Sequence, residues 1–258
     1  MKYFKKVAVF LVTFTVCFSS MEGVFAKDAD ESLAADTEIA AEIGDDVVIS
    51  SSDKPYLALG ENLSDEQRKK VLDLMGIDEK NLSDYDVVYV NNKEEHEYLD
   101  SYISSSEIGT RSLSSVVITQ ADKGAGLSIS AYNIDYCTIG MYKNACATAG
   151  VEDAKIIIAG PFPLSGTAAL VGIFKAYQEM TGERIHEDVM DAAMDEIVTT
   201  GELNQSIDAD PQQVEALIAD LKSQLNSLDS DADIKEAILK TAEEYNIELT
   251  DDEMAQIT

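Results

Sequence analysis

Segments with the character of β-strands alternate with helical segments as far as Gly182, and only helical segments follow. Residues 86–90 are Asp-Val-Val-Tyr-Val, and residues 154–159 contain three consecutive isoleucines, both typical of strands. Such alternation predicts an α/β (α+β) fold in which helices flank a mixed β-sheet. We expect this domain over residues 46–182 and a C-terminal helical segment over residues 183–258.

The other strands are expected in four runs of β-forming residues. Polar residues and glycines at 121–126 separate the last two runs, and this spacing predicts a β-hairpin between them. The expected strands are 47–50, 56–59, 113–120 and 127–132.

Capping residues and glycines mark the expected ends of the helices. Asp210 and Pro211 are typical of a helix start, and Gly201 is expected to end the helix before them. Two further helices are expected at 139–149 and 166–180. The expected capping pairs are Ser64 with Gln67, Asn92 with Glu95, and Thr250 with Glu253.

An apolar stripe with helical spacing follows Pro211. We interpret it as part of a core, and a groove for a partner helix is the alternative. The stripe consists of Val214, Leu217, Ile218, Leu221, Leu225 and Leu228.

Residues 1–26 have the three parts of a secretory signal peptide. Lysines precede an uncharged run from Val7 to Met21, and Val24 and Ala26 supply the small side chains that signal peptidase accepts. The run of 15 residues is shorter than the roughly 20 that a spanning helix needs, so an uncleaved anchor is the less favoured alternative. We expect cleavage after Ala26, no membrane span after cleavage, and a location outside the cell or in its envelope.

Strong acidity limits the partners of the exported chain. The formal charge of −30 becomes −32 when cleavage removes three lysines and one glutamate. Such a surface repels nucleic acid and anionic lipid, and it is compatible with cations, a basic partner or an envelope component. The charge also keeps a secreted protein in solution without any partner. Residues 27–45 are acidic, contain no aromatic residue, and are expected to form a flexible leader.

Two cysteines, Cys137 and Cys146, follow the cleavage site. An oxidising exterior permits a disulfide, but the helix predicted at 139–149 argues against one. Nine residues at about 1.5 Å of rise separate the two Cα atoms by roughly 13 Å, beyond the bridging limit of about 7 Å. We therefore expect two buried thiols.

One block of the sequence resembles a known family. Residues 159–170, Ala-Gly-Pro-Phe-Pro-Leu-Ser-Gly-Thr-Ala-Ala-Leu, together with 147–155, resemble the YpuA-like family of secreted proteins from Gram-positive bacteria, domain of unknown function 1002. The resemblance extends to Glu-Glu-His at 94–96 and to 63–67, and covers most of the chain from about residue 46. It implies an exported, envelope-associated protein and carries over no catalytic residue.

The candidate binding site lies where the strand at 154–159 leads into the next helix. Free backbone amides at a helix N-terminus attract anions, and Ser165, Gly166 and Thr167 add two hydroxyls and room for close approach. We interpret these three residues as a candidate site for an anion or a carboxylate. The simpler interpretation, which we favour, is that Ser165 only caps the helix and the nearby prolines stiffen the turn.

No complete catalytic set is present in the sequence. A nucleophile elbow needs glycine two residues before and after its serine, and around Ser165 these positions hold Pro163 and Thr167. A base would have to be His96 or His186, and both lie in acidic helical segments expected at the surface. A serine triad is therefore disfavoured.

The sequence also lacks the complete motif of a calcium or zinc site. Asp229, Asp231 and Asp233 alternate like the start of a calcium loop, but Ile234 and Lys240 stand where its glycine and glutamate belong. Neither histidine has a second histidine four residues on, as a zinc motif needs. We expect no cofactor and no metal beyond weak calcium binding at the acidic surface.

Export, acidity and the incomplete catalytic set favour one function. We expect a secreted, noncatalytic binding or interaction protein of the bacterial cell envelope. The alternative is a hydrolase or transferase that acts on an envelope polymer, with its site at the strand-to-helix turn at 160–167.

Overall fold

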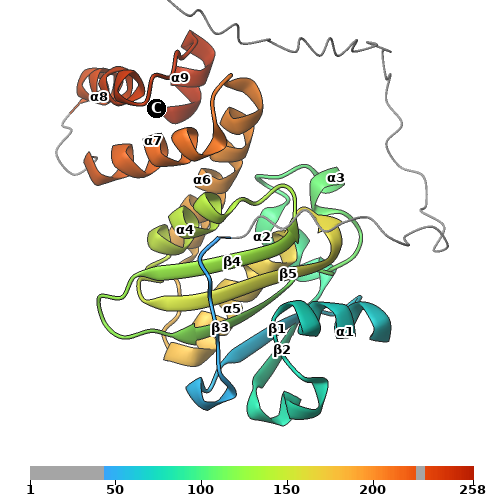
Figure 1. Ribbon diagram of the computed structural model, residues 1–258. Helices are drawn as coiled ribbons and strands as arrows, with labels where there is room; N and C mark the ends of the chain where they lie inside the picture. The colour runs from blue at the N-terminus through green and yellow to red at the C-terminus, as the bar shows by residue number, and fades with distance from the viewer. Residues whose placement is uncertain (1–43, 225–229) are drawn as a thin grey trace, which may run out of the picture. The chain divides into compact units, whose positions relative to one another are not determined.

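The computed structural model describes residues 44–224 and 230–258 (Figure 1). The predictions for the signal peptide at 1–26, for nearly all of the leader at 27–45, and for Leu225, Leu228 and Asp229 lie outside these residues. Within them, a five-stranded sheet is flanked by helices and followed by helices only, which confirms the predicted fold class.

The sheet is mixed. Its strands are β1 (Tyr56–Gly60), β2 (Asp86–Val90), β3 (Ser115–Gln120), β4 (Leu127–Ile134) and β5 (Ala154–Leu164). They lie in the order β2-β1-β3-β5-β4. β1 pairs with β2, and β4 with β5, in parallel, whereas β3 runs antiparallel to both β1 and β5.

Helices precede, separate and follow the strands. Short 3-10 helices lie at Ser51–Asp53 and Glu79–Asp84. The capping boxes that begin at Ser64 and Thr250 form as predicted. The α-helices are α1 (Asp65–Leu74), α2 (Asn92–Leu99), α3 (Ser105–Ile108), α4 (Ile139–Thr148), α5 (Thr167–Thr181), α6 (Glu187–Ser206), α7 (Pro211–Gln224), α8 (Asp231–Glu244) and α9 (Asp251–Ile257).

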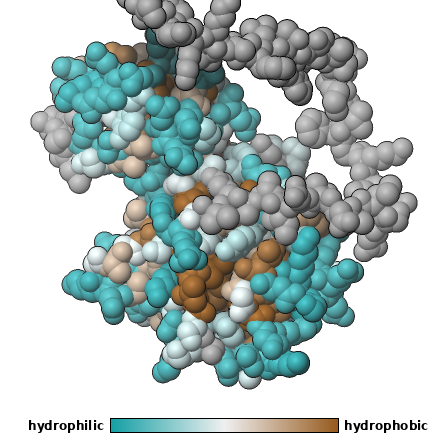
Figure 2. Space-filling view, in the orientation of Figure 1, coloured by the Kyte–Doolittle hydropathy of each residue, from teal (hydrophilic) through white to brown (hydrophobic). Residues whose placement is uncertain are grey.

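Alternate residues of the central strands point to opposite faces of the sheet. Ile156 of β5 packs into the larger core with α5, whereas Ile157 lies in the core on the α1 side. Figure 2 shows hydrophobic side chains gathered beside α1 on the face in view. Gly172 lets α5 approach closely, because a Cβ there would lie 2.9 Å from the Cβ of Ala58.

α6 contributes to the sheet-side core and to a second core among the C-terminal helices. Met194 and Ile197 pack on the sheet side, and Leu203 packs with α7 and α8. The predicted apolar stripe is core rather than an open groove wherever the structure describes it. Its buried residues are Val214, Leu217, Ile218 and Leu221.

The predicted hairpin between β3 and β4 is wrong. β5 lies between these strands and pairs with both of them. Residues 121–126 instead cross the end of β5, where the Asp153 carboxylate accepts hydrogen bonds from the amides of Gly124 (3.0 Å) and Gly126 (2.8 Å). The isoleucine-rich strand gives both β3 and β4 a buried partner, so side-chain packing decides the pairing over the local turn signal.

β5 is longer than predicted and continues through Leu164. Within the described residues, only Leu164 of β5 is paired beyond Ala159, with Ile134 of β4, because β3 begins at Ser115 opposite Ala159. Proline is tolerated at an unpaired strand edge, which explains Pro161 and Pro163 within the strand. The turn from strand to helix therefore consists of Ser165 and Gly166.

Residues 47–50 do not form the predicted strand. The Asp45 amide donates to the Ile129 carbonyl on the outer edge of β4 at 3.1 Å, as a ladder would begin. The next donor, the Val47 amide, bonds to the carbonyl of Asp45 in its own segment at 2.9 Å and to the Ser130 hydroxyl at 3.3 Å, and not to a backbone carbonyl of β4. A local turn and a side chain thus satisfy this amide, and the ladder along β4 does not continue.

Gly201 does not end α6, which continues to Ser206. A Cβ at Gly201 would lie 2.7 Å from the hydroxyl of Tyr136 and 3.3 Å from the end of Met141. The glycine therefore serves close packing within the helix, and the prediction of a helix end is wrong.

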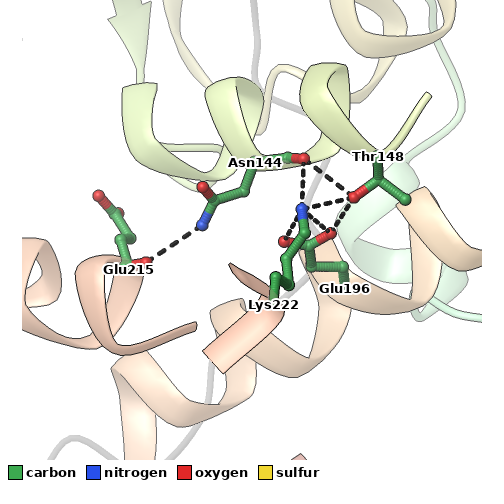
Figure 3. A network of polar contacts seen from close by, with 5 residues as sticks. All are labelled: Asn144, Thr148, Glu196, Glu215 and Lys222. Carbon is green, nitrogen blue, oxygen red and sulfur yellow. Dashed lines mark hydrogen bonds and ion pairs between the residues drawn. The ribbon is translucent and has the colours of Figure 1, made fainter. Parts of the chain in front are cut away.

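A polar network ties α7 to α4 and α6 (Figure 3). The Lys222 ammonium donates to both Glu196 oxygens at 2.9 Å, to the Thr148 hydroxyl at 2.6 Å and to the Asn144 carbonyl at 3.0 Å. Beside it, the Asn144 amide group donates to the Glu215 carbonyl at 3.2 Å. The Glu196 side chain is only 11% exposed, so Lys222 neutralises a charge that is largely withdrawn from water.

Replacing Lys222 by Ala is expected to lower the free energy of unfolding by about 1–2 kcal/mol, because Glu196 then keeps a mostly buried charge without its cation. Lys240→Ala is the matched control, since Lys240 pairs with Glu244 at 3.9 Å between two exposed side chains. That change is expected to cost less than about 0.5 kcal/mol. Urea denaturation of both variants measures the difference, and equal losses would contradict this role of the network.

Candidate functional site

β5 leads into α5 through a tight turn at Ser165 and Gly166. Gly166 is the N-cap residue with a φ of 89°, a left-handed conformation that favours glycine. The Tyr142 hydroxyl donates to the Gly166 carbonyl at 2.8 Å, and a Cβ on Gly166 would lie 2.3 Å from that hydroxyl. Helix α5 begins at Thr167 with Gly166 as its N-cap residue, so the interpretation of Ser165 as the helix cap is wrong.

The N-terminus of α2 differs from the prediction by one residue. The Asn91 side chain accepts from the Glu94 amide, and the Glu94 carboxylate accepts from the Asn91 amide, both at 3.0 Å. The predicted pair of Asn92 and Glu95 is therefore wrong, and Glu95 faces inward. Helical spacing is the signal that could have found it, because Glu95 precedes the buried Leu99 by four residues and shares its face.

The Glu95 side chain is 1% exposed. The Thr167 hydroxyl of α5 donates to Oε1 at 3.0 Å, and the Asn92 amide group approaches Oε2 at 3.4 Å. The buried Ser112 hydroxyl faces the same carboxyl group without reaching full hydrogen-bond geometry. Burial raises the pKa of Glu95 to about 7 against the opposing effect of the Thr167 hydrogen bond. Near neutral pH the group is thus divided between its acid and its anion.

Glu95 borders a cavity of about 230 Å³ that lies among α2, the segment before β3, and the N-terminus of α5. We call this cavity the Glu95 pocket. Apolar side chains, Leu113 and Leu164 among them, complete its wall. The Arg111 side chain is exposed and brings a positive charge to its mouth. The polar residues of the Glu95 pocket are Glu95, Thr110, Arg111, Ser114, Ser165 and Thr167.

The first turn of α5 offers hydrogen-bond donors to the Glu95 pocket. The Ala169 amide donates to the Ser114 hydroxyl at 2.9 Å. Among the described residues, no acceptor meets the amides of Thr167 and Ala168, as is usual in a first helical turn. The Ser165 and Thr167 hydroxyls lie 3.2 Å apart. Two of the three predicted site residues therefore line the pocket, while Gly166 shapes the turn beneath it.

Neither histidine is placed to activate Ser165. His96 Nδ1 lies 2.6 Å from an Asp100 carboxylate oxygen, and Nε2 lies 3.1 Å from the Gly109 carbonyl. Both partners are acceptors, so these contacts favour the charged form of the ring, in which both nitrogens donate. The hydrogen bond to Asp100 correspondingly raises the pKa of His96. His186 lies exposed at the start of α6.

Cys137 and Cys146 are both buried and are not joined by a disulfide, as predicted. Cys146 lies within α4, and burial raises the pKa of its thiol to about 12. A thiol that stays protonated is a poor nucleophile and a poor metal ligand, so Cys146 has a packing role.

Metal ligands do not gather in the part of the chain that the structure describes. No group of three or more His, Cys, Asp or Glu side chains there is arranged to hold an ion. Of the aspartates in the calcium-like run, Asp233 accepts a hydrogen bond from the Ser230 hydroxyl at 2.7 Å. Over the same residues, no helix combines the length and apolar character needed to cross a membrane.

Replacing Glu95 by Gln is expected to change how stability depends on pH. Glu95 ionises near its ordinary pKa of 4.5 in the unfolded chain and near 7 in the folded one. Between these values the folded state binds more protons, so stability falls as the pH rises, by roughly 3 kcal/mol in total. The variant lacks this loss and is expected to be more stable than the wild type at pH 8, with a much smaller gain at pH 5. Urea denaturation at both pH values measures the effect.

Glu253→Gln provides the control. Glu253 is also buried, but hydrogen bonds from Thr250 lower its pKa, so its stabilising effect is present above pH 4.5 and lost only in more acidic solution. This variant is expected to show no gain at pH 8. If Glu95→Gln and the wild type had the same free energy of unfolding at both pH values, Glu95 would be ionised in the folded protein.

Comparison with known proteins identifies the family. A family model described as Protein of unknown function (DUF1002) matches residues 59–258. The chain is 44% identical over 204 residues to the Uncharacterized protein YpuA of Bacillus subtilis (strain 168), a match that covers 78% of this chain and 68% of that protein. No solved structure matches the chain. Because the family model spans most of the sequence and the whole Glu95 pocket, the chain belongs to the DUF1002 family, as the resemblance predicted.

Proposed function

We propose that this chain is a secreted, noncatalytic binding protein of the bacterial cell envelope and that the Glu95 pocket is its ligand site. The N-terminal pattern of lysines, an uncharged run and Ala26 supports export. The formal charge of −30 supports an envelope component or a basic partner over nucleic acid and anionic lipid.

The arrangement of polar groups in the Glu95 pocket carries this proposal. Thr167 and Ala168, whose backbone amides meet no acceptor among the described residues, line one cavity together with Ser165 and the exposed Arg111. Convergent polar groups around a perturbed titratable residue are typical of ligand sites. Donors of these kinds suit an anion or a carboxylate, the ligand class expected at Ser165, Gly166 and Thr167.

The surroundings of Ser165 support binding rather than covalent catalysis. Its hydroxyl contacts the Thr167 hydroxyl, and the ring nitrogens of His96 are occupied by Asp100 and Gly109. A hydroxyl without a base beside it is a weak nucleophile. The pocket therefore has the groups to hold a ligand and lacks a serine–histidine pair.

A hydrolase or transferase of an envelope polymer is the alternative, and Glu95 favours it. A carboxyl group with a pKa near 7 suits general acid–base catalysis, and the Thr167 hydroxyl donates directly to this group. Turnover of purified cell-wall polymer that disappears in both Glu95→Gln and Thr167→Val, with folding intact, would replace the binding proposal with this one.

Arg111→Ala is expected to weaken binding to isolated cell envelopes by about tenfold, because the change removes the exposed cation at the mouth of the Glu95 pocket. Cosedimentation of the purified chain with envelopes, at a fixed ionic strength, measures the affinity. The wild type is expected to sediment with the envelopes.

Arg184→Ala is the matched control, since Arg184 is exposed, lies outside the pocket, and carries the same charge. Its affinity is expected to equal that of the wild type. Equal losses in the two variants would show that charge alone, and not the pocket, governs binding. A wild-type chain that stays in the supernatant would rule out the proposed partner.

A further inference from the structure

The Glu95 pocket contains a buried acidic residue, whereas a simple anion site would contain a basic residue such as arginine or lysine at that position. None of the ion pairs among the described residues involves Glu95, whose nearest partners are the uncharged Thr167 and Asn92. An ionised carboxylate that is 1% exposed and has no cation in contact is costly. The geometry therefore favours a proton on Glu95, above all when a second negative charge enters the cavity.

A carboxylate is the anion that can use this proton best. Two ionised carboxylates repel each other in a buried site, whereas an acid and a carboxylate share one proton and attract. The ligand oxygens can accept from the amides of Thr167 and Ala168, while Glu95 donates its proton to one of them. The wall of the cavity then supplies three hydrogen bonds to the two oxygens of the ligand group.

The size of the cavity limits what can enter. Its volume of about 230 Å³ is smaller than the roughly 300–1,000 Å³ of sites that enclose a whole drug-sized molecule. One terminal group of a larger ligand fits, with the rest of that ligand outside beside Arg111. Leu113 and Leu164 leave an apolar border for the carbon that carries the carboxylate.

We propose that the Glu95 pocket binds a terminal carboxylate of its ligand and that Glu95 and this carboxylate share a proton in the bound state. The inference rests on the proposed function of the pocket. If Glu95 is ionised in the free protein, the complex takes up one proton from solvent as it forms. Apart from this proton uptake, binding makes only hydrogen bonds. The pKa of about 7 makes the protonated form available in neutral to mildly acidic surroundings.

Other charged groups around α2 must be separated from Glu95 in any test. His96 also loses charge as the pH rises, and this loss would weaken anion binding without involving Glu95. A variant that keeps His96 and changes only Glu95 makes the separation. Besides Glu95, the charged groups of α2 are Lys93, Glu94, His96 and Glu97, with Asp100 as its C-cap residue. Those on neighbouring elements include Arg111 before β3, Lys175 on α5, and Glu187, Asp191 and Asp195 on α6.

An NMR titration of the full chain with acetate at pH 5.5 and pH 8.5 tests the proposal. Acetate is small enough for the cavity and mostly ionised at both pH values. The protonated fraction of Glu95 falls to about 3% at pH 8.5, so acetate is expected to bind roughly thirty-fold more weakly there, with shifts centred on the amides of residues 165–168. Acetamide, which has the same shape and no charge, is expected to bind far more weakly at both pH values.

Glu95→Gln is expected to bind acetate with affinities within about threefold of each other at the two pH values, because its amide group donates without titrating. Glu253→Gln, the control, replaces a buried acid far from the pocket. It is expected to retain the pH dependence of acetate binding of the wild type.

Three outcomes would overturn the proposal. They are absence of acetate binding, a pH dependence that persists in Glu95→Gln, and preference of the wild type for inorganic phosphate or sulfate at pH 8.5. Envelope binding that depends on Arg111 could still hold in each case, so the failure of this inference is distinct from the failure of the proposed function.

Discussion

The hydrogen bond from Thr167 to Glu95 joins the first turn of α5 to α2, and the geometry of the candidate site depends on it. The same turn is held from two further sides, by the Tyr142 hydroxyl on the Gly166 carbonyl and by the Ser114 hydroxyl on a backbone amide. Because these contacts come from separate elements, the first turn of α5 and its free amides are held in a fixed position at the wall of the cavity. A preorganised set of donors loses little entropy when a ligand binds.

The carboxyl groups of Glu196, which is 11% exposed, and of Glu95, which is 1% exposed, have opposite kinds of partner. Glu196 receives a cation from Lys222 and supports the packing of α7 on α4 and α6. Glu95 receives only uncharged donors, and burial raises its pKa to about 7. A carboxyl group kept in this state lowers stability at neutral pH, which is the pattern expected where a group is retained for binding or chemistry.

The sequence predicts features that depend on neighbouring residues and misses those that depend on distant ones. The capping box at Ser64 forms as predicted, because every group in it lies within one helical turn. The hairpin fails because Ile157 and its neighbours, far along the chain, pack better between β3 and β4. Ser165 and Thr167 could be proposed from the expected helix start. Capping residues alone do not predict the inward turn of Glu95, because Asn91 and Asn92 offer equivalent capping registers and only the spacing of Glu95 from the buried Leu99 distinguishes them.

The protonation state of Glu95 in the folded protein is the central claim, and carbon-13 NMR of glutamate side-chain carboxyl groups measures it directly. Glu95→Gln assigns the resonance by its disappearance from the spectrum. The account predicts a titration midpoint close to pH 7 for this one resonance, with exposed glutamates titrating near their ordinary values. A midpoint at or below 4.5 would show an ionised Glu95 at neutral pH and would contradict the account.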